Sequence, residues 1–524
     1  MIVGAGSAGC VLANRLSADP RHRVLLLEAG GKARNPLLHI PIGFGKTMHS
    51  PHYSWNFETE PDLGGRRRKW PRGKVLGGSS TINGLLYIRG QREDYDGWRQ
   101  LGCTGWSYDD VLPYYRRSQD SDRADDPLHG SGGPLRVEHP QGQHPVSSRF
   151  VDACVQAGIP YNDDPNGAVQ EGVAYAPVTM RRGVRCSAAT AFLDPVRTRG
   201  NLHIVTGALV EGVDIADGRA TAVRYRVGGV AHRAVALEEI ILSAGAIGSP
   251  QLLMLSGIGD GDALAAVGVE ARVQSPDVGR NLQDHLASMV IASLTPSATF
   301  NEVVRSPAIL GQMWRYATAR GGMFASAAAH VVVFCRSDTR LASPDIQLHM
   351  LPASTSDYAG GDLDRFPGLT CAPCQLRPES RGEVTLRSAD PAAPPVIRPN
   401  YLSAPADQEA LVAGIRISRR ILAQPALADI VEREVMPGAD VEASASLLAS
   451  AAMLSESVYH PVGTCRMGGD PASVVDPRLR VRGVAGLRVA DASIMPRLIS
   501  GNTNAPAIMI GEKAAAMILE DARG

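Results

Sequence analysis

A histidine and an asparagine near the carboxyl end of the chain are the side chains best suited to chemistry. His460 lies in the segment Val458–Gly468, and Asn504 lies in the segment Gly501–Pro506. An imidazole titrates near neutral pH, so His460 can accept the proton of a hydroxyl group and hold the resulting alkoxide. The neutral amide of Asn504 can hydrogen-bond the same oxygen. The pair is therefore predicted to act on an alcohol.

Each of these side chains also has a plainer interpretation. His460 could be a packed structural histidine. Asn504 could be a helix cap, because asparagine is favoured at that position and Pro506 suits the first turn of a helix. Asn504 could also serve both purposes. We interpret His285, which follows an acidic residue, as structural.

The opposite end of the chain carries a dinucleotide-binding pattern. Two apolar residues lead into Gly4-Ala5-Gly6-Ser7-Ala8-Gly9, a helix is expected over 10–16, and a buried parallel strand is expected over 23–28. Such glycines allow a tight turn and a close approach to pyrophosphate at a helix start, and a carboxylate about 20 residues later can bind a ribose. The alternative is a glycine-rich turn that only packs a helix closely. The candidate nucleotide-binding residues are Gly4, Gly6, Ser7, Ala8, Gly9, Glu28 and Ala29.

A long irregular segment and a second glycine-rich loop follow. Residues 36–70 are rich in proline, glycine, histidine and aromatic side chains, and we expect them to form a lid over the ligand, because loops of this length are usually functional. In the next loop, paired glycines and hydroxyl groups permit the backbone to approach a flat ligand or a phosphate. The alternative is a plain loop before a strand. The candidate binding residues here are Arg72, Leu76, Gly77, Gly78, Ser79, Asn83, Gly84 and Leu86.

The middle of the chain contains β-rich segments. Segments 201–206, 208–215 and 219–227 are expected to form a small antiparallel sheet, with Asp217-Gly218 as a hairpin turn. A buried strand over 240–246 and a proline-started helix over 249–259 then return to the ligand.

Three further segments are expected to contribute binding residues. Val210 comes from the small sheet, the strand over 240–246 contributes Ala244 and Gly245, and the strand over 486–491 ends in an acid that can hold a ribityl or pyrophosphate group. A helix that begins at Asn504 would point its positive end at the ligand and stabilise negative charge on it. The candidates at the carboxyl end are Asp491, Ala492, Asn504, Ala505 and Pro506.

Composition limits the class of protein. The chain has 524 residues, with 53 basic and 53 acidic side chains, so no overall charge favours nucleic acid or an anionic surface. No apolar run is long enough for a membrane span, which needs about 18 residues. The eight cysteines, including the pair Cys371 and Cys374, are expected to be ordinary buried thiols, with a metal or redox role as the weaker alternative. Since only three residues precede the first glycine, either the first strand is short or the natural chain starts upstream.

The segments described above resemble the glucose–methanol–choline oxidoreductase family, and most closely its choline dehydrogenase-like bacterial branch. The resemblance extends from Gly4 to the carboxyl end. Besides the glycine, His460 and Asn504 segments, it rests on 72–83, 245–259, 278–285 and 376–382.

The resemblance implies a fold, a cofactor and a catalytic pair. It implies an α/β chain in which a Rossmann-like FAD-binding domain (1–140, 185–290 and 456–524) is interleaved with an α+β substrate domain on an antiparallel sheet (141–184 and 291–455). It implies FAD, an alcohol substrate, and His460 with Asn504 facing flavin N5. Asn83, Gly77 and Gly78 would flank the isoalloxazine, and Val210 would lie at the adenine side. Some relatives join a histidine to the flavin at the position of Ile82, so that covalent link is expected to be absent here.

Three functions remain open from the sequence. The first is oxidation of an alcohol by hydride transfer to FAD, the second is a non-redox lyase on the same fold, and the third is a nicotinamide dehydrogenase. Among alcohols, a primary aliphatic or aryl alcohol is favoured over choline, because aromatic residues that could surround a quaternary ammonium are only 5% of the chain. The electron acceptor is oxygen or a quinone-type carrier. The expected compartment is the cytoplasm, with peripheral membrane attachment and oligomer formation left open.

Overall fold

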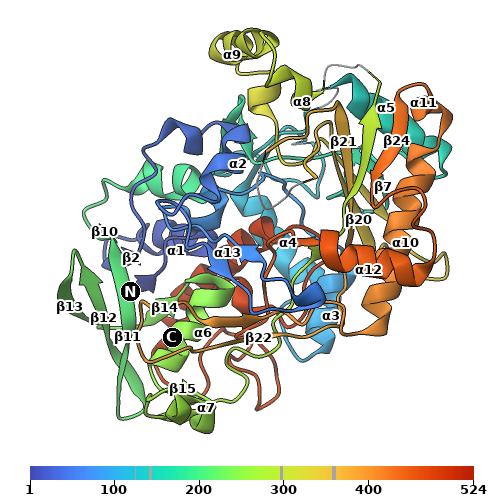
Figure 1. Ribbon diagram of the computed structural model, residues 1–524. Coiled ribbons are helices and arrows are strands. Elements are labelled where there is room, and N and C mark those ends of the chain that lie inside the picture. The colour runs from blue at the N-terminus through green and yellow to red at the C-terminus, as the bar shows by residue number, and fades with distance from the viewer. Residues whose placement is uncertain (124, 141–143, 296–298, 357–361, 524) are drawn as a thin grey trace.

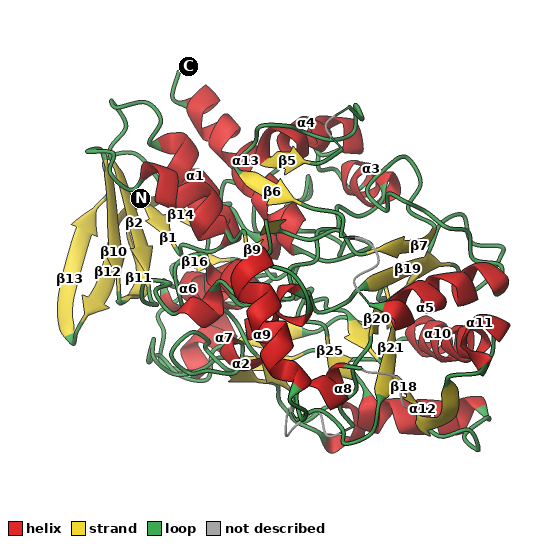
Figure 2. Ribbon diagram, turned by 90° about the horizontal axis from the view of Figure 1, so that it is seen from above, coloured by secondary structure: helices red, strands yellow, loops and turns green. Residues whose placement is uncertain are grey.

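Two β-sheets organise the molecule. The computed structural model describes residues 1–123, 125–140, 144–295, 299–356 and 362–523. In the view of Figure 2, the strands β1, β2, β10 and β14 lie on one side and the strands β7 and β18–β21 on the other, with segments from both ends of the chain between them. The interleaving of one domain with the other follows from this arrangement, because the chain passes from the first sheet to the second and back.

The first sheet is parallel and carries the amino-terminal glycines. Its strands are largely apolar and buried, as expected for a parallel sheet covered by helices, except the edge strand over 202–206, where only Leu202 is buried. Helix α1 (Ser7–Leu16) packs against helix α13 (Asn504–Asp521), so the two ends of the chain lie side by side (Figure 1). The strands, in order across the sheet, are β10 (Leu202–Thr206), β2 (Val24–Glu28), β1 (Ile2–Val3), β14 (Ile240–Leu242) and β26 (Leu487–Val489).

Segment 201–206 is a strand as predicted, but the prediction that it belongs to the small antiparallel sheet is wrong. This segment forms β10, which pairs parallel with β2 and extends the first sheet. The small antiparallel sheet instead consists of β11 (Ala208–Ala216), β12 (Arg219–Val227) and β13 (Val230–Val235). Asp217 and Gly218 both have positive φ, +49° and +70°, which gives the predicted tight hairpin turn. Alternation alone did not separate β10 from the hairpin, because a strand's sheet is decided by distant partners.

The second sheet is antiparallel and lies on the side of the molecule opposite the first sheet in Figure 2. Helix α10 (Pro405–Leu422) packs on β21 and β20, and α5 (Pro145–Gln156), α11 (Pro425–Ala428) and α12 (Ser444–Leu454) lie around it (Figure 1). A strand, β24, separates α11 from α12. The strands in order are β24 (Val431–Met436), β18 (Val290–Leu294), β21 (Gly368–Gln375), β20 (Ile346–Leu351), β19 (Val331–Cys335) and β7 (Gly172–Tyr175), with β17 (Leu286–Ala287) and β25 (Glu456–Ser457) beside β21.

The helix expected over 249–259 starts earlier. Helix α6 covers Gly245–Leu255 and holds Pro250 in its interior. Proline cannot donate the hydrogen bond that a helix would give to Ala246 O. The hydroxyl of Thr464 donates to that carbonyl at 2.6 Å, which explains why the helix continues through Pro250.

The remaining elements are short and connect the two sheets. The helices are α2 (Phe44–Thr47), α3 (Arg92–Gln100), α4 (Tyr108–Ser118), α7 (Gly261–Ala266), α8 (Phe300–Val303) and α9 (Ala308–Ala319). The two-stranded pairs are β3 (Phe57–Glu58) with β4 (Lys69–Trp70), β5 (Gln119–Ser121) with β6 (Leu135–Val137), β8 (Met180–Arg181) with β9 (Val184–Arg185), β15 (Ile258–Gly259) with β16 (Val273–Gln274), and β22 (Glu383–Thr385) with β23 (Val396–Arg398).

The structure answers two questions that the sequence raised, the state of the cysteines and the presence of a membrane-spanning helix. All eight cysteines are buried free thiols, and Cys371 and Cys374 lie on β21 in two different apolar clusters, so their spacing does not create a two-thiol site. Within the described ranges, no helix is both long and apolar enough to cross a bilayer.

Candidate active site

A single large cavity brings the two ends of the chain to the second sheet. Its volume is about 1290 Å³, above the range of about 300–1,000 Å³ usual for small-ligand sites, so it has room for a dinucleotide and a substrate. The lining includes nineteen of the residues proposed above. They are Gly4, Gly6, Ser7, Ala8, Glu28, Ala29, Arg72, Gly78, Ser79, Asn83, Gly84, Leu86, Val210, Ala244, Gly245, His460, Asp491, Ala492 and Asn504.

Five proposed binding residues lie behind the cavity wall and are not in its lining. They are Gly9, Leu76, Gly77, Ala505 and Pro506. Gly9 is nevertheless required, because a Cβ atom there would stand 1.9 Å from Gly4 O. Gly9 therefore acts by letting α1 pack against the turn and not by facing a ligand.

The amino-terminal turn has the shape of a phosphate cradle. Gly4 has φ +98°, in the region that favours glycine, and the turn leads directly into the start of α1. A Cβ on Gly78 would lie 2.7 Å from Gly6 Cα, so the two glycine-rich loops touch backbone to backbone. The open N–H groups at the start of α1 suit a pyrophosphate. These features fit a dinucleotide such as FAD.

Glu28 ties the cradle together at the end of β2. Its carboxylate accepts hydrogen bonds from the backbone N–H groups of Ala5 and Gly30, each at 2.8 Å. Burial raises the pKa of Glu28 to about 7, although these two bonds oppose the shift. The carboxyl group thus shapes the turn and lies in the cavity lining, where a ribose hydroxyl would reach it.

Asp491 joins the carboxyl-terminal strand to α6. It accepts hydrogen bonds from the backbone N–H of Gly245 at 2.9 Å and from the Ser249 hydroxyl at 2.5 Å. Burial raises the pKa of this carboxyl group. Because β14 and β26 are neighbouring parallel strands, Asp491 holds Gly245 beside it at the carboxyl end of this sheet.

Asn504 does not contact His460 in the described hydrogen bonds. It is the first helical residue of α13, with Thr503 at the N-cap position, and its Oδ1 accepts a hydrogen bond from the Ser7 hydroxyl at 2.8 Å. Ser7 is the first residue of α1. The Ser7–Asn504 bond thus holds two helix N-termini together at the cavity, where both would favour an anionic ligand.

Asn502 is the amide that the fold brings to His460. Its Nδ2 donates to His460 Nε2 at 3.2 Å, and its Oδ1 accepts from Gln347 Nε2 at 3.2 Å, which orients the amide. Both Asn502 and His460 line the cavity. Sequence reasoning passed over Asn502, although it lies in the same segment as Asn504. The predicted helix start could have pointed to Asn502. Asn504, as the first helical residue, turns toward α1, whereas Asn502 lies before the helix and turns toward His460.

His285 fixes which nitrogen of His460 carries the proton. His285 Nε2 donates to the carbonyl of Leu376 at 2.9 Å, and burial lowers the pKa of His285 to about 4, so its Nδ1 is a bare acceptor. His460 Nδ1 lies 3.0 Å from that nitrogen and must donate to it. His460 Nε2 is therefore unprotonated and faces Asn502. His285 was interpreted as structural from the sequence, and in the structure it also orients the His460 imidazole.

Burial also keeps His460 neutral. Desolvation lowers the pKa of its imidazole well below the ordinary value, and His285, His349 and Arg72 add to the shift. Neutral imidazole with a bare Nε2 is the form that can accept a proton. His349 also lines the cavity, and within the described ranges its buried Nδ1 has no hydrogen-bond partner, so it offers one more polar contact to a ligand.

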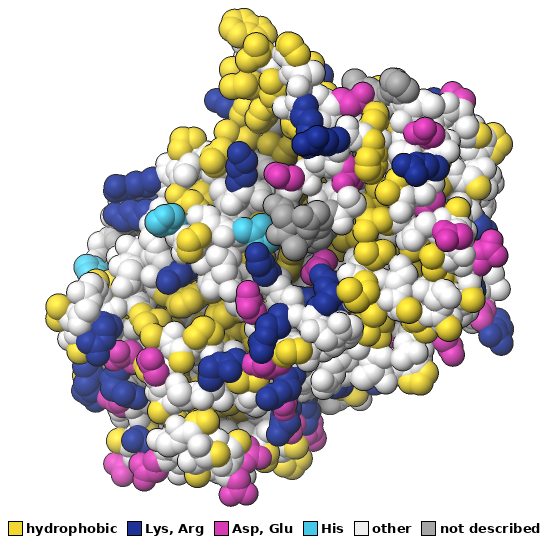
Figure 3. Space-filling view, viewed as in Figure 1, with side chains coloured by type: hydrophobic (Ala, Val, Ile, Leu, Met, Phe, Trp, Pro, Cys, Tyr) yellow, Lys and Arg dark blue, Asp and Glu magenta, His cyan; other side chains and the backbone are white. Residues whose placement is uncertain are grey.

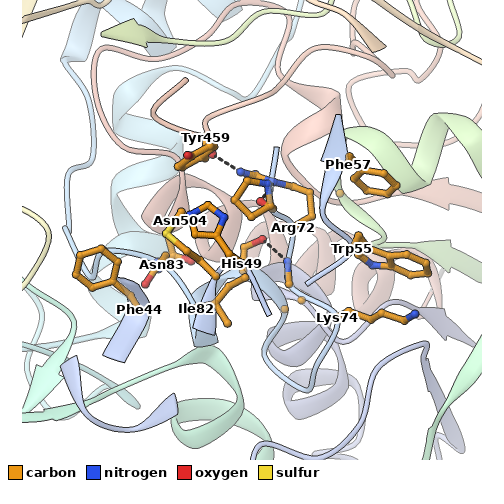
Figure 4. A pocket seen from close by; sticks show the side chains of 18 of the residues that line it. Phe44, His49, Trp55, Phe57, Arg72, Lys74, Ile82, Asn83, Tyr459 and Asn504 are labelled. Atoms are coloured by element: carbon orange, nitrogen blue, oxygen red, sulfur yellow. Dashed lines mark hydrogen bonds between the residues drawn. The ribbon is translucent and has the colours of Figure 1, made fainter. Parts of the chain in front are cut away.

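Asp284 and Arg72 support the His460 backbone. Asp284 accepts from the backbone N–H of His460 at 2.7 Å, from the Ser457 hydroxyl at 2.5 Å and from the Tyr401 hydroxyl. Burial raises the pKa of Asp284 to about 6. The Arg72 guanidinium donates to Tyr459 O at 2.9 Å, a contact visible in Figure 4. The turn around His460 is thus held from both sides.

The glycine-rich loop is braced by a buried arginine that sequence reasoning missed. Asn83 Oδ1 accepts from Arg185 Nη1 at 2.7 Å and from the backbone N–H of Leu85 at 3.1 Å. Arg185 forms no ion pair with any described residue, and burial lowers its pKa to about 9. No motif marked it, because a single arginine before a helix has many ordinary uses.

Segment 36–70 borders the cavity. Phe44, Trp55 and Phe57 line it, and Figure 4 shows Phe44 on one side of the labelled residues and the Trp55–Phe57 pair on the other. Trp55 and Phe57 are stacked with ring centroids 5.8 Å apart. Tyr53 is not in the lining and packs with Leu38, Val75 and Ile82. That this segment forms a lid over the bound ligand stays a prediction.

The chain is similar to known proteins over almost its whole length. A family model described as GMC oxidoreductase matches residues 1–287 in its N-terminal part and 378–511 in its C-terminal part. An alcohol dehydrogenase [acceptor] of Pseudomonas putida is 44% identical, covering 99% of this chain and 95% of that protein. Human mitochondrial choline dehydrogenase is 42% identical, covering 99% and 89%. The crystal structure of pyridoxine 4-oxidase from Mesorbium loti has a TM-score of 0.90 at 32% identity, covering 99% and 98%.

Proposed function

Because this chain belongs to the GMC oxidoreductase family, we propose that it oxidises an uncharged primary aliphatic or aryl alcohol to the aldehyde. The family and its solved relatives are FAD-dependent enzymes that act on CH–OH groups, so the reaction class and the cofactor are those of this chain. The proposal concerns the substrate and the residues that carry the reaction.

The His285–His460–Asn502 hydrogen-bond series is the observation that carries the proposal. An alcohol oxygen that replaces the direct Asn502–His460 hydrogen bond would give its proton to the bare Nε2 of His460 and accept a hydrogen bond from Asn502 Nδ2. His285 accepts the proton on His460 Nδ1 throughout, so the imidazolium that forms stays oriented. Bound FAD supplies the acceptor for the hydride that leaves the alcohol carbon. Gly4, Ser7, Glu28, Asn83 and Asp491 would hold it.

The charge of the wall favours an uncharged substrate over choline. The described lining residues that come from the second sheet include no aspartate or glutamate to pair with a quaternary ammonium. Three described acidic residues line the cavity. Glu28 and Asp491 are bound at two helix starts of the cofactor side, and Asp362 lies exposed in the loop between β20 and β21. The aromatic rings of Phe44, Trp55 and Phe57 suit an apolar carbon chain or an aryl ring. A quaternary ammonium would also bind such rings, but the Trp55 ring already carries the Lys74 ammonium, 4.4 Å from its centroid.

An anaerobic alcohol panel tests the function. The FAD-loaded protein is mixed without oxygen with benzyl alcohol, a series of primary aliphatic alcohols and choline, and flavin bleaching is followed. We expect fast bleaching with the uncharged alcohols and weak bleaching with choline. Fast bleaching by choline alone would replace the substrate proposal by the choline alternative. No bleaching by any member would favour the non-redox lyase. Admission of air then distinguishes oxygen from a quinone-type carrier as electron acceptor.

The cofactor is proposed to be held without a covalent bond at position 82. Ile82 lines the cavity, and its hydrocarbon side chain offers no nitrogen for a histidyl link. Acid precipitation of the FAD-loaded protein should leave the flavin in the supernatant. Flavin that stays with the pellet would contradict the non-covalent interpretation.

A further inference from the structure

Helix α9 exposes large apolar side chains on its outer face, unlike an ordinary surface helix. The face toward the protein uses Ile309, Gln312 and Tyr316: Gln312 Oε1 accepts from the backbone N–H of Met323 at 3.0 Å, and the Tyr316 hydroxyl donates to Gly183 O at 3.0 Å. A surface helix normally turns its polar face to water and its apolar face to the core. Here two of the three inward residues are anchored by hydrogen bonds.

The outward face of α9 is apolar. Leu310, Met313 and Trp314 are 66%, 53% and 72% exposed, and they follow the i, i+3, i+4 spacing of one helix face. The neighbouring Val304 is 38% exposed. Figure 1 shows α9 standing out at the top of the molecule, and Figure 3 shows the same protrusion covered largely by hydrophobic side chains. Such a contiguous apolar patch marks an interaction surface.

Helix α9 and its C-cap carry Arg315 and Arg320 and no acidic side chain, whereas Arg305 before the helix contacts the loop that holds Asp362 and Asp364. Residues 303–337 contain four arginines and no aspartate or glutamate. Arg315 and Arg320 are exposed and form no ion pair with any described residue. An apolar helix face beside unpaired arginines is complementary to a surface with anionic headgroups over an apolar layer.

The same region borders the mouth of the active-site cavity. Val304, Arg305 and Ile309 line the cavity, and the exposed lining residues Leu37 and Lys46 come from the segment opposite them. A surface that covers α9 would therefore also lie at the mouth.

We propose that α9 inserts its Leu310–Met313–Trp314 face into the interfacial layer of an anionic phospholipid membrane. Arg315 and Arg320 contact the headgroups, and the cavity opens at the membrane surface. An apolar alcohol or a lipid-soluble electron carrier would then reach the cavity from the bilayer. This attachment does not depend on which alcohol the enzyme oxidises, so it can fail while the proposed function stands.

Vesicle flotation of the FAD-loaded full chain tests the proposal. We expect binding to equimolar phosphatidylcholine–phosphatidylglycerol vesicles, weaker binding to phosphatidylcholine alone, and loss of the difference at high salt. The double variant Leu310→Ser/Trp314→Ser should bind at least about tenfold more weakly. Arg315→Gln and Arg320→Gln should each weaken binding to the anionic vesicles about fivefold.

Two matched measurements separate this proposal from others. The variant Leu237→Ser removes a side chain that is 73% exposed near the β13 hairpin, away from α9, and should bind vesicles like the wild type. Lipids brominated on the acyl chain should quench fluorescence in the wild type and much less in Trp314→Phe, because Trp70, Trp98 and Trp106 are fully buried and Trp55 is half-buried in the cavity lining.

Three results would overturn the proposal. The first is absence of wild-type binding to either vesicle, and the second is unchanged binding of the double variant. The third is a wild-type dimer whose mass, measured by light scattering, halves in Leu310→Ser/Trp314→Ser, since α9 would then join two copies of the chain.

Discussion

The cofactor wall around Gly4–Gly9 and the catalytic wall around His460 are held by different kinds of contact. In the first, backbone meets backbone: the Gly78 turn touches Gly6, and Glu28 accepts from two backbone N–H groups. In the second, side chains from three distant segments form a series through His285, His460 and Asn502. The comparison teaches that the cofactor wall depends on the absence of side chains, whereas the catalytic wall depends on their protonation and orientation.

The largest effect is expected on the catalytic wall at its base. His460→Ala should slow anaerobic flavin reduction by about 10²–10⁴, because it removes the proton acceptor. FAD content, read from the visible spectrum, should stay near one per chain, because the cofactor wall is untouched. An unchanged reduction rate in the folded, FAD-loaded variant would exclude His460 as the base.

The next effect separates two asparagines that lie two residues apart. Asn502→Ala should lower the reduction rate by about 10²-fold, because it removes a hydrogen-bond donor to the reacting oxygen. Asn504→Ala should change the rate far less and should instead weaken FAD retention, because it loses the bond that joins the starts of α1 and α13. Stopped-flow reduction and FAD release on dilution measure the two properties. If Asn504→Ala slows reduction and Asn502→Ala weakens FAD retention, Asn504 is the catalytic amide.

A smaller effect on reduction is expected at His285, which acts through His460. His285→Leu removes the acceptor for the Nδ1 proton, so part of the His460 population takes the unproductive tautomer, and the limiting reduction rate should fall about tenfold. The alcohol dissociation constant should change little. His285→Asn keeps an acceptor oxygen and should recover part of the rate. If both variants behave alike, the tautomer argument fails and His285 is only structural.

The smallest effect on reduction, and a distinct effect on stability, is expected in the cofactor wall. Burial raises the folded-state pKa of Glu28 from 4.5 to about 7, so its carboxyl group favours the folded protein below pH 4.5 and loses that contribution as pH rises toward 7. Glu28→Gln removes this titration. The difference in Tm between the FAD-free variant and the FAD-free wild type should therefore shift in favour of the variant as pH rises from 4.5 to 7. A constant Tm difference across this range would show that Glu28 is not perturbed.

The sequence by itself determined the parts that rest on local backbone geometry. The glycines of the first turn, the strand that ends at Glu28 and the Asp217-Gly218 hairpin were all predictable, because backbone freedom and apolar runs act over neighbouring residues. The FAD-dependent alcohol chemistry also followed, since several specific segments pointed to one family. The domain boundaries remain predictions.

Only the tertiary structure decided which side chains meet. β10 joined the parallel sheet, and Pro250 stayed inside α6, where the Thr464 hydroxyl donates to the free carbonyl of Ala246. Asn502 hydrogen-bonds His460, whereas Asn504, which lines the same cavity, hydrogen-bonds Ser7. The physical reason is that these outcomes depend on partners hundreds of residues away or on the direction of one side chain at a helix start. Spacing along the chain does not contain that direction; packing of α13 against α1 supplies it.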